Sequence, residues 1–472
     1  MSTSTHAPRR RELTGGLDHG TLVVAGVATL GLIMAVLDTT IVNVALDTLS
    51  RDLNAGLGTV QWISTGYLLA LAVVIPLSGW ITERFGSKRT WITSLALFGA
   101  GSALCGLASS VGELIAFRVL QGLGGGMLMP VGFTLIAQRA GPQRVGRALG
   151  LIGIPILLGP IFGPIIGGAI VDDASWRLIF TVNVPIALIA IAVAARALAP
   201  DAGRPEGGAG RLDWLGAVLL CPGLGGIVFG LSQVESHGGL SAPAAVGPLV
   251  TGVALIALFA WHSLRVPRAL IDLQLFRRPG FRAAATLTFL LGAALFGTLL
   301  VLPLYFQLER GQSALHAGLL LAPQGIGAAL VLPLSGQLTD RLGGGRVALV
   351  GCAITALATL PLVLVDAHTS FVALDAVLFV RGIGLGASIQ PATAAAYATL
   401  TADAVPRATA ALNTLRQIGG SIGTALLAVV LQHEGGMTPS PGAFGRVFVW
   451  SAGLMALTLL PAIALSRDRA AR

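Results

Sequence analysis

The chain is a succession of long apolar runs separated by short polar connections. Each run is about 18–26 residues long and apolar on all sides, which is the length that an α-helix needs to cross a bilayer. Transmembrane barrels show short alternating segments instead, so these runs predict membrane-spanning helices. The fourteen runs lie near residues 21–46, 60–81, 90–110, 113–138, 146–171, 177–198, 213–233, 245–263, 283–307, 314–338, 347–366, 371–397, 407–431 and 447–465.

Composition also indicates that lipid is the solvent. Of the 472 residues, 54% are hydrophobic and 11% are charged, whereas soluble domains carry about 25% charged residues. The three cysteines lie inside apolar runs, and neither they nor the seven histidines have metal-ligand spacing. We therefore expect no metal and no cofactor.

The basic residues are distributed unevenly between the two sides of the predicted bundle. The two tails and alternate connections hold 23 of the 30 basic residues, and the opposite connections hold four. By the positive-inside rule, this asymmetry predicts a multi-pass protein of the cytoplasmic membrane with both termini in the cytoplasm. It also accounts for the net charge of +9, so we expect no nucleic-acid partner.

The sequence contains an internal repeat. Residues 79–89 recur as 336–346, and Arg118–Gly124 recurs loosely as Arg381–Gly386. Both copies occupy equivalent places, which predicts two halves of parallel topology around a site at mid-membrane depth. The expected division is a tail (1–20), a six-helix bundle (21–198), a linker (199–212), two additional central helices (213–263), a linker (264–282), a second six-helix bundle (283–466) and a tail (467–472).

The repeated loops carry glycine and charge at matched positions. Gly86 and Gly343 suit a turn with positive φ, while Glu83 and Asp340 can bond backbone N–H groups or pair with arginine. A charged turn that serves topology alone is the alternative, and two matched copies argue against it. The predicted conformational gate loops comprise Gly79, Glu83, Arg84, Gly86, Arg89, Asp340, Arg341 and Gly343.

With these loops, the chain resembles the major facilitator superfamily, and it looks most like the fourteen-helix drug:proton antiporter branch of multidrug efflux type. Further segments that resemble the family are 37–46, 118–124, 159–168 and 176–185. The resemblance implies an all-α integral membrane protein with two six-helix bundles plus two extra central helices. It also implies an antiporter motif at Gly159, Gly163, Pro164, Gly167 and Gly168.

The glycines of that motif have a physical interpretation of their own. Gly159, Gly163 and Gly167 recur every four residues and form a smooth ridge that another helix can approach closely. Pro160 and Pro164 favour a bend in the same helix. We interpret the ridge as a seal that two halves close and reopen, with a static packing face as the alternative.

One carboxylate, Asp38, lies within the first apolar run. A charge at such a depth costs about 2.5–3.5 kcal/mol on insertion scales, so it requires a partner, a proton or a water-filled cavity. Arg118 is expected at a similar depth, with Asn43 and Gln121 as candidate hydrogen-bond partners. Alternation between an arginine-paired and a desolvated environment lets a carboxylate bind and release a proton. A permanent structural ion pair is the alternative.

Two further arginines, Arg381 and Arg416, lie within predicted helices of the second half. Pairing between Asp375 and Arg381 is one expectation for them. Three intramembrane arginines against one deep acid are unfavourable for a strongly cationic substrate and tolerable for neutral or anionic ones. The cavity and substrate candidates are Asn43, Gln121, Trp62, Tyr67, Arg381, Gln390 and Arg416, although aromatic side chains at such positions also face lipid or neighbouring helices.

The sequence has no phosphate-binding loop and no cluster typical of an enzyme active site. It therefore predicts a proton-coupled antiporter that exports small amphipathic compounds by alternating access. The expected partners are that substrate, protons and the lipid bilayer, and a monomer is compatible with the sequence. The alternatives are a symporter or uniporter for a metabolite, and a non-transporting membrane receptor.

Overall fold

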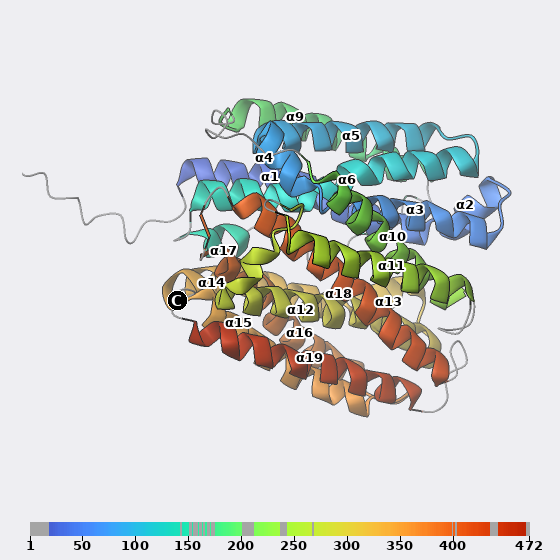
Figure 1. Ribbon diagram of the computed structural model, residues 1–472. Coiled ribbons are helices and arrows are strands. Elements are labelled where there is room, and N and C mark those ends of the chain that lie inside the picture. Colours follow the sequence, from blue (N-terminus) through green and yellow to red (C-terminus); the bar gives the residue numbers. More distant parts are fainter. Residues whose placement is uncertain are drawn as a thin grey trace, which may run out of the picture.

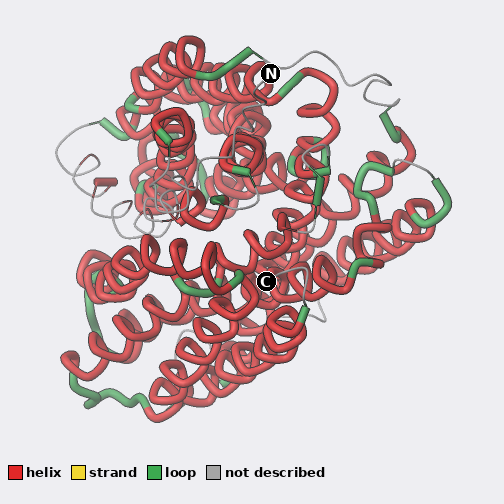
Figure 2. The backbone as a smooth tube through the Cα atoms, turned by 90° about the vertical axis from the view of Figure 1, so that its left-hand side faces the viewer, coloured by secondary structure: helices red, strands yellow, loops and turns green. Residues whose placement is uncertain are grey.

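The computed structural model is a bundle of long helices (Figure 1). It describes residues 18–468 apart from 142–143, 151–152, 154–158, 160–162, 164–165, 168–169, 171–174, 201–211, 237–242, 267–268, 399, 402–403 and 435–441. The described chain begins and ends on the same side of the bundle, which we call the terminal end. Seen from that end, the helices fall into two groups (Figure 2).

The first group holds the helices of the N-terminal half. They are α1 (His19–Val44), α2 (Leu46–Asp52), α3 (Leu57–Val74), α4 (Ser78–Phe85), α5 (Ser87–Leu107), α6 (Val111–Ala140), α8 (Arg177–Thr181) and α9 (Asn183–Ala197). Helices α3 and α4 are inclined at 57° to each other. Pro76 lies at their junction, and proline breaks a helix because it lacks the N–H group and restricts the preceding residue. The described residues of segment 145–170 are also helical.

The second group holds the helices of the C-terminal half. They are α12 (Pro279–Leu304), α13 (Ala314–Leu320), α14 (Ala322–Leu342), α15 (Gly344–Thr359), α16 (Phe371–Gly386), α17 (Ile389–Ala398), α18 (Val405–His433) and α19 (Ala443–Arg467). Three short helices, η1 (Leu273–Arg277), η2 (Tyr305–Glu309) and η3 (Leu360–Leu364), lie in the connections or extend α12 and α15.

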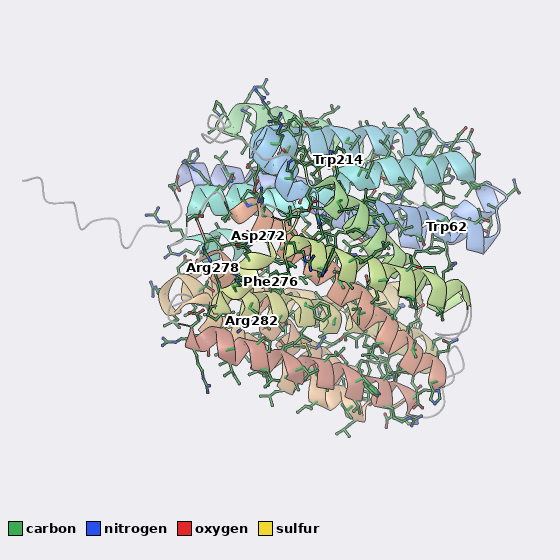
Figure 3. All side chains as sticks on the ribbon, in the orientation of Figure 1. Trp62, Trp214, Asp272, Phe276, Arg278 and Arg282 are labelled. Atoms are coloured by element: carbon green, nitrogen blue, oxygen red, sulfur yellow. The ribbon has the colours of Figure 1, made fainter. Side chains whose placement is uncertain are left out.

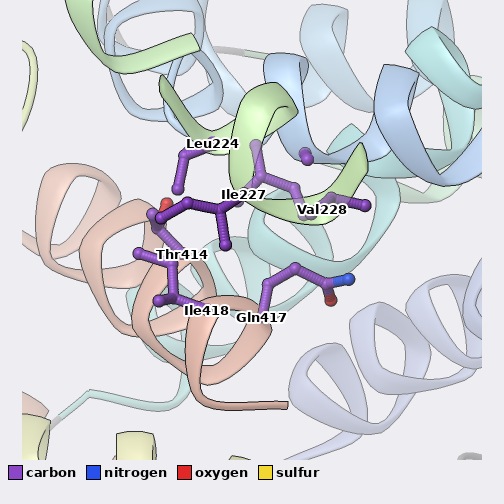
Figure 4. Close-up of a pocket in the computed structure, with 8 residues that line it drawn as sticks. Leu224, Ile227, Val228, Thr414, Gln417 and Ile418 are labelled. Atoms are coloured by element: carbon purple, nitrogen blue, oxygen red, sulfur yellow. The ribbon is translucent and has the colours of Figure 1, made fainter. Parts of the chain in front are cut away.

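Two central helices, α10 (Trp214–Ser236) and α11 (Pro243–Ser263), follow the first half in the chain. Helix α10 contacts α3 through the thiol of Cys221, which donates to the carbonyl of Val73 at 3.1 Å. It also meets α18 of the second half around a small cavity lined by Leu224, Ile227 and Val228 and by Thr414, Gln417 and Ile418 (Figure 4). Helix α10 thus contacts both halves. Helix α11 lies mostly at the surface, since only 17% of its most apolar stretch is buried.

The surface of the bundle is suited to lipid. Large apolar side chains on several helices are more than half exposed, among them Leu188, Val250, Leu357 and Leu460. Exposed apolar surface of this extent is typical of a protein that is covered by lipid. Within the described residues, eleven helices are long and apolar enough to span a membrane, and α3 with α4 makes a twelfth. Helix α10, whose described apolar part is shorter, and segment 145–170 account for the rest, so the predicted fourteen helices are consistent with the structure.

The two repeated loops form matching turns. Gly86 joins α4 to α5 with φ 91° and ψ 155°, and Gly343 joins α14 to α15 with φ 87° and ψ 140°. This region of backbone space is almost restricted to glycine. The prediction of positive φ at both glycines is confirmed.

We expect Gly86→Ala to lower the free energy of unfolding by about 1–3 kcal/mol, because alanine must adopt a backbone conformation that its Cβ disfavours. The matched control is Gly26→Ala, since a Cβ at Gly26 meets no atom within 4 Å. The unfolding temperatures of the two variants in detergent are compared by heating samples and measuring the remaining monodisperse protein by size-exclusion chromatography. Equal unfolding temperatures would contradict the conformational argument.

Candidate functional site

A buried ion pair joins α1 and α6 in the middle of the first half. Arg118 Nη1 donates to Asp38 Oδ2 at 2.6 Å, and neither side chain is more than 1% exposed. Water is thus excluded from both charges, and a buried charge is stable only when it is paired and hydrogen-bonded. The structure therefore brings together the two residues that the sequence placed at one depth.

Two amides complete the environment of the carboxylate. Gln121 Nε2 donates to Asp38 Oδ1 at 2.8 Å, and Asn183 Nδ2 donates to the same oxygen at 3.1 Å. Ser102 Oγ accepts from Gln121 at 2.6 Å and from Asn183 at 3.4 Å, which links the two amides. The carboxylate thus has donors from three side chains, an arrangement that satisfies its ionised, acceptor-only form.

The guanidinium group of Arg118 is also held on its other sides. Its ζ carbon lies 4.0 Å from the centre of the Tyr67 ring, and Nε donates to the carbonyl of Ile63 at 3.3 Å. Helices α5 and α6 approach closely beside it, since a Cβ at Gly101 would lie 2.6 Å from the Cα of Gln121. The charges are therefore fixed by backbone and ring contacts as well as by each other.

The second half contains a related arginine that has no acidic partner among the residues described there. Arg381 Nη1 donates to Gln324 Oε1 at 2.5 Å, and Nε donates to Thr359 Oγ1 at 3.3 Å. An offset of 257 residues relates Gln324 to Tyr67 and Thr359 to Ser102, so the two arginine sites are structural counterparts.

The two charges of the second half do not meet. Arg381 is fully buried and its Nη2 has no hydrogen-bond partner among the described residues. The pairing of Asp375 with Arg381 that the sequence suggested is not formed, because Gln324 and Thr359 occupy the guanidinium group and Asp375 Oδ1 has no partner in the described part of the chain.

The other predicted cavity residues are dispersed. Trp62, labelled in Figure 3, is 40% exposed. It stacks on Phe229 of α10 with ring centres 5.4 Å apart, so it contacts a central helix. Gln390 is 6% exposed, and its Oε1 has no partner among the described atoms. Arg416 lies on α18, and the side chain of Asn43 lies outside the described residues.

Among the residues that the structure describes, two ion pairs between the halves are seen, and both lie at the terminal end. Arg407 Nη2 is 2.7 Å from Glu83 Oε2, and Arg147 Nε is 3.0 Å from Asp340 Oδ2. Asp340 Oδ1 also accepts from the backbone N–H of Gly146 at 3.1 Å. Each repeated loop thus reaches an arginine near the start of a helix in the opposite half. The other predicted gate arginines, Arg84, Arg89 and Arg341, are exposed at the surface.

Glycines let the halves approach closely beside these ion pairs. A Cβ at Gly79 would lie 3.1 Å from the Cα of Arg407, and a Cβ at Gly336 would lie 2.8 Å from the carbonyl of Gly146. In segment 145–170, a Cβ at Gly150 would lie 2.7 Å from the carbonyl of Leu332. Gly146, Gly150 and Gly153 therefore face the second half, a role that was not predicted for these glycines from the sequence.

The predicted glycine ridge has a different neighbour from the one expected. A Cβ at Gly159 would lie 2.2 Å from Val36, and a Cβ at Gly163 would lie 1.9 Å from Thr40. In this conformation these glycines pack on α1 of the same half, which agrees with the alternative of a packing face, and the seal between the halves stays a prediction. Gly167 likewise faces Ile41, while Pro164 and Gly168 lie outside the described residues.

Comparisons with known proteins agree with one another. Residues 28–424 match the family model of the Major Facilitator Superfamily. The chain is 40% identical to the "Multidrug resistance protein B homolog" of Mycobacterium tuberculosis (strain ATCC 25618 / H37Rv) over 90% of this chain and 79% of that protein. It is 33% identical to the "Putative multidrug resistance protein MdtD" of Serratia proteamaculans (strain 568), covering 93% and 92%.

Two more comparisons concern a resistance protein and a fold. The chain is 30% identical to the "Lincomycin resistance protein LmrB" of Bacillus subtilis (strain 168), covering 84% of this chain and 83% of that protein. The crystal structure of the human organic anion transporter MFSD10 (TETRAN) superimposes with a TM-score of 0.67, covering 94% of this chain and 99% of the other. At 15% identity, that likeness concerns the fold alone.

The terminal ion pairs can be tested by exchanging their charges. We expect Glu83→Arg to separate the halves at the terminal end, because it places two cations together, and the double variant Glu83→Arg/Arg407→Glu to restore the closed distance. Spin labels at Arg84→Cys and Arg341→Cys report that distance by double electron–electron resonance. Both positions are exposed, whereas the three native cysteines are buried and should not be labelled. An unchanged distance distribution in Glu83→Arg would show that the pair does not hold the halves.

Proposed function

Because this chain belongs to the Major Facilitator Superfamily, a family of membrane transporters, we propose that it is a proton-coupled antiporter that exports small amphipathic compounds by alternating access. The observation that carries the proposal is the enclosed Asp38 carboxylate with its arginine partner. The resistance proteins among its relatives support a drug-like substrate.

Asp38 is the proposed proton carrier. As an ionised group it accepts hydrogen bonds from Arg118, Gln121 and Asn183. A proton on the carboxylate removes its charge and part of its acceptor capacity, so the attraction between α1 and α6 weakens when the proton binds. Loss of the proton restores the pair. The helices around Asp38 thus have two local arrangements, one with the ionised and one with the protonated carboxylate. If Asp38 is accessible from opposite sides of the membrane in the two arrangements, proton binding is coupled to transport.

The glycine contacts offer a route from this site to the terminal end. Gly159 and Gly163 lie against Val36 and Thr40 of α1, close to Asp38, and Arg147, near the start of the same segment 145–170, forms one of the two described ion pairs between the halves. A movement of α1 therefore displaces a segment that takes part in closing the terminal end. We propose that this segment couples protonation to the rocking of the two six-helix halves, 21–198 and 283–466.

The direction of transport follows from the proposed orientation. The excess of basic residues at the terminal end supports a cytoplasmic location for both termini. The ion pairs of Glu83 and Asp340 then close the cytoplasmic side in the described conformation. Opening this side requires both pairs to separate, which is the step that admits a compound from the cytoplasm.

We expect Asp38→Asn to reduce proton-driven export to the background of empty vesicles while expression is retained, because an amide cannot carry the proton. The matched control is Asp375→Asn, which removes an intramembrane carboxylate that has no ion-pair partner among the described residues. Substrate-induced proton release from acidified inverted vesicles, screened with lincomycin, dyes and lipophilic acids, measures the coupling. Full coupling in Asp38→Asn would refute the carrier role, and proton movement in the same direction as substrate would favour a symporter.

A further inference from the structure

Arg416 is a charged residue that the proton pathway does not use. It lies on α18, half-buried, and its Nη2 donates to Asn413 Oδ1 at 2.6 Å one turn earlier on the same helix. Its ζ carbon is 5.9 Å from the centre of the Phe133 ring on α6. The guanidinium group therefore lies at the boundary between the two halves, held by a neutral amide and next to an aromatic side chain of the opposite half.

In the described part of the chain, no carboxylate compensates this charge. Among the described residues, Arg416 takes part in no ion pair, and the deep acid Asp38 is already bound by Arg118. Tyr397, which also lies near Arg416, accepts a hydrogen bond from Thr409 and is a neutral phenol. The fully buried Arg381 adds a second positive charge to the same half, again without an acid in the described chain.

The surroundings of Arg416 offer both polar and apolar contacts. The adjacent Gln417 and the nearby Thr414 line the cavity between α3, α10 and α18, and Thr414 Oγ1 is buried without a hydrogen-bond partner among the described atoms (Figure 4). Ile75 and Ile227 supply apolar walls to that cavity. The cation of Arg416 thus lies on α18 next to residues that line an apolar cavity between α3, α10 and α18, and one buried hydroxyl there, Thr414 Oγ1, has no partner among the described atoms.

We propose that Arg416 binds the anionic group of the exported compound, so that the preferred substrates are amphipathic acids. A guanidinium group forms two parallel hydrogen bonds with a carboxylate and stacks on aromatic rings. Outside water, a positive charge without a counter-charge is costly, and a bound carboxylate supplies the missing charge. Phe133 of the opposite half, which is 2% exposed in this conformation, is the aromatic neighbour of that guanidinium group. This proposal rests on the proposed export function and specifies its substrate class.

Equilibrium binding tests the proposal without a proton gradient. The probes are dansyl-phenylalanine, which carries a carboxylate, and dansyl-phenylalaninamide, its neutral analogue, titrated by fluorescence into the purified protein in nanodiscs at neutral pH. We expect the wild type to bind the acid about tenfold more tightly than the amide, a ratio that one charge-assisted pair readily provides. Arg416→Gln should reduce that ratio to about one, whereas Arg416→Lys should retain part of it because lysine keeps the charge without the planar fork.

Three controls separate this result from other causes. Arg282→Gln removes an exposed cation of α12 (Figure 3) and should leave the ratio unchanged. Unchanged binding of the amide to Arg416→Gln shows that the variant is folded, and Arg416→Lys provides a second variant if it is not. Binding is measured without a proton gradient, so a wild type that prefers the acid but shows no substrate-induced proton release would refute the proton mechanism and leave this proposal intact. Equal affinity of the wild type for both probes, no binding of the acid, or a preserved ratio in Arg416→Gln would overturn the proposal.

Discussion

The structure of the first half depends on the cost of placing a carboxylate in a low-dielectric interior. Asp38 cannot remain charged there without a partner, and Arg118 meets it at 2.6 Å with almost no exposure of either side chain. Two amides and a serine then satisfy the remaining hydrogen-bonding groups. Four helices, α1, α5, α6 and α9, thereby meet around one charge.

Much of this arrangement could be predicted from the sequence because lipid imposes strict rules. A span must be long and apolar, so the runs locate the helices to within a few residues. An intramembrane acid needs a partner, so Asp38 and Arg118 could be matched by depth before any contact was known. A loop repeated in both halves with glycine at the same place indicated Gly86 and Gly343 as turns of positive φ, and both adopt that conformation.

The contacts between helices could not be predicted in the same way, because periodicity does not say which helix faces which. Asn183 lies at the start of α9, within the segment 176–185 that resembles the family, but that resemblance does not indicate that its side chain reaches Asp38 on α1. The glycines 159, 163 and 167 have the spacing of a close-packing ridge, but that spacing is equally compatible with a partner in either half, and the partner is α1. Trp62 of α3 stacks on Phe229 of the central helix α10, a contact that depends on how α10 packs against α3.

The uncompensated arginines of the second half have a consequence for energetics. Arg381 and Arg416 lie inside membrane-spanning helices and carry no acid partner within the described chain. Any tilting of that half displaces their charge through the electric field across the bilayer. A unit charge moved across the full field gains or loses about 2.3 kcal/mol per 100 mV, so even a partial displacement makes the balance between conformations depend on voltage.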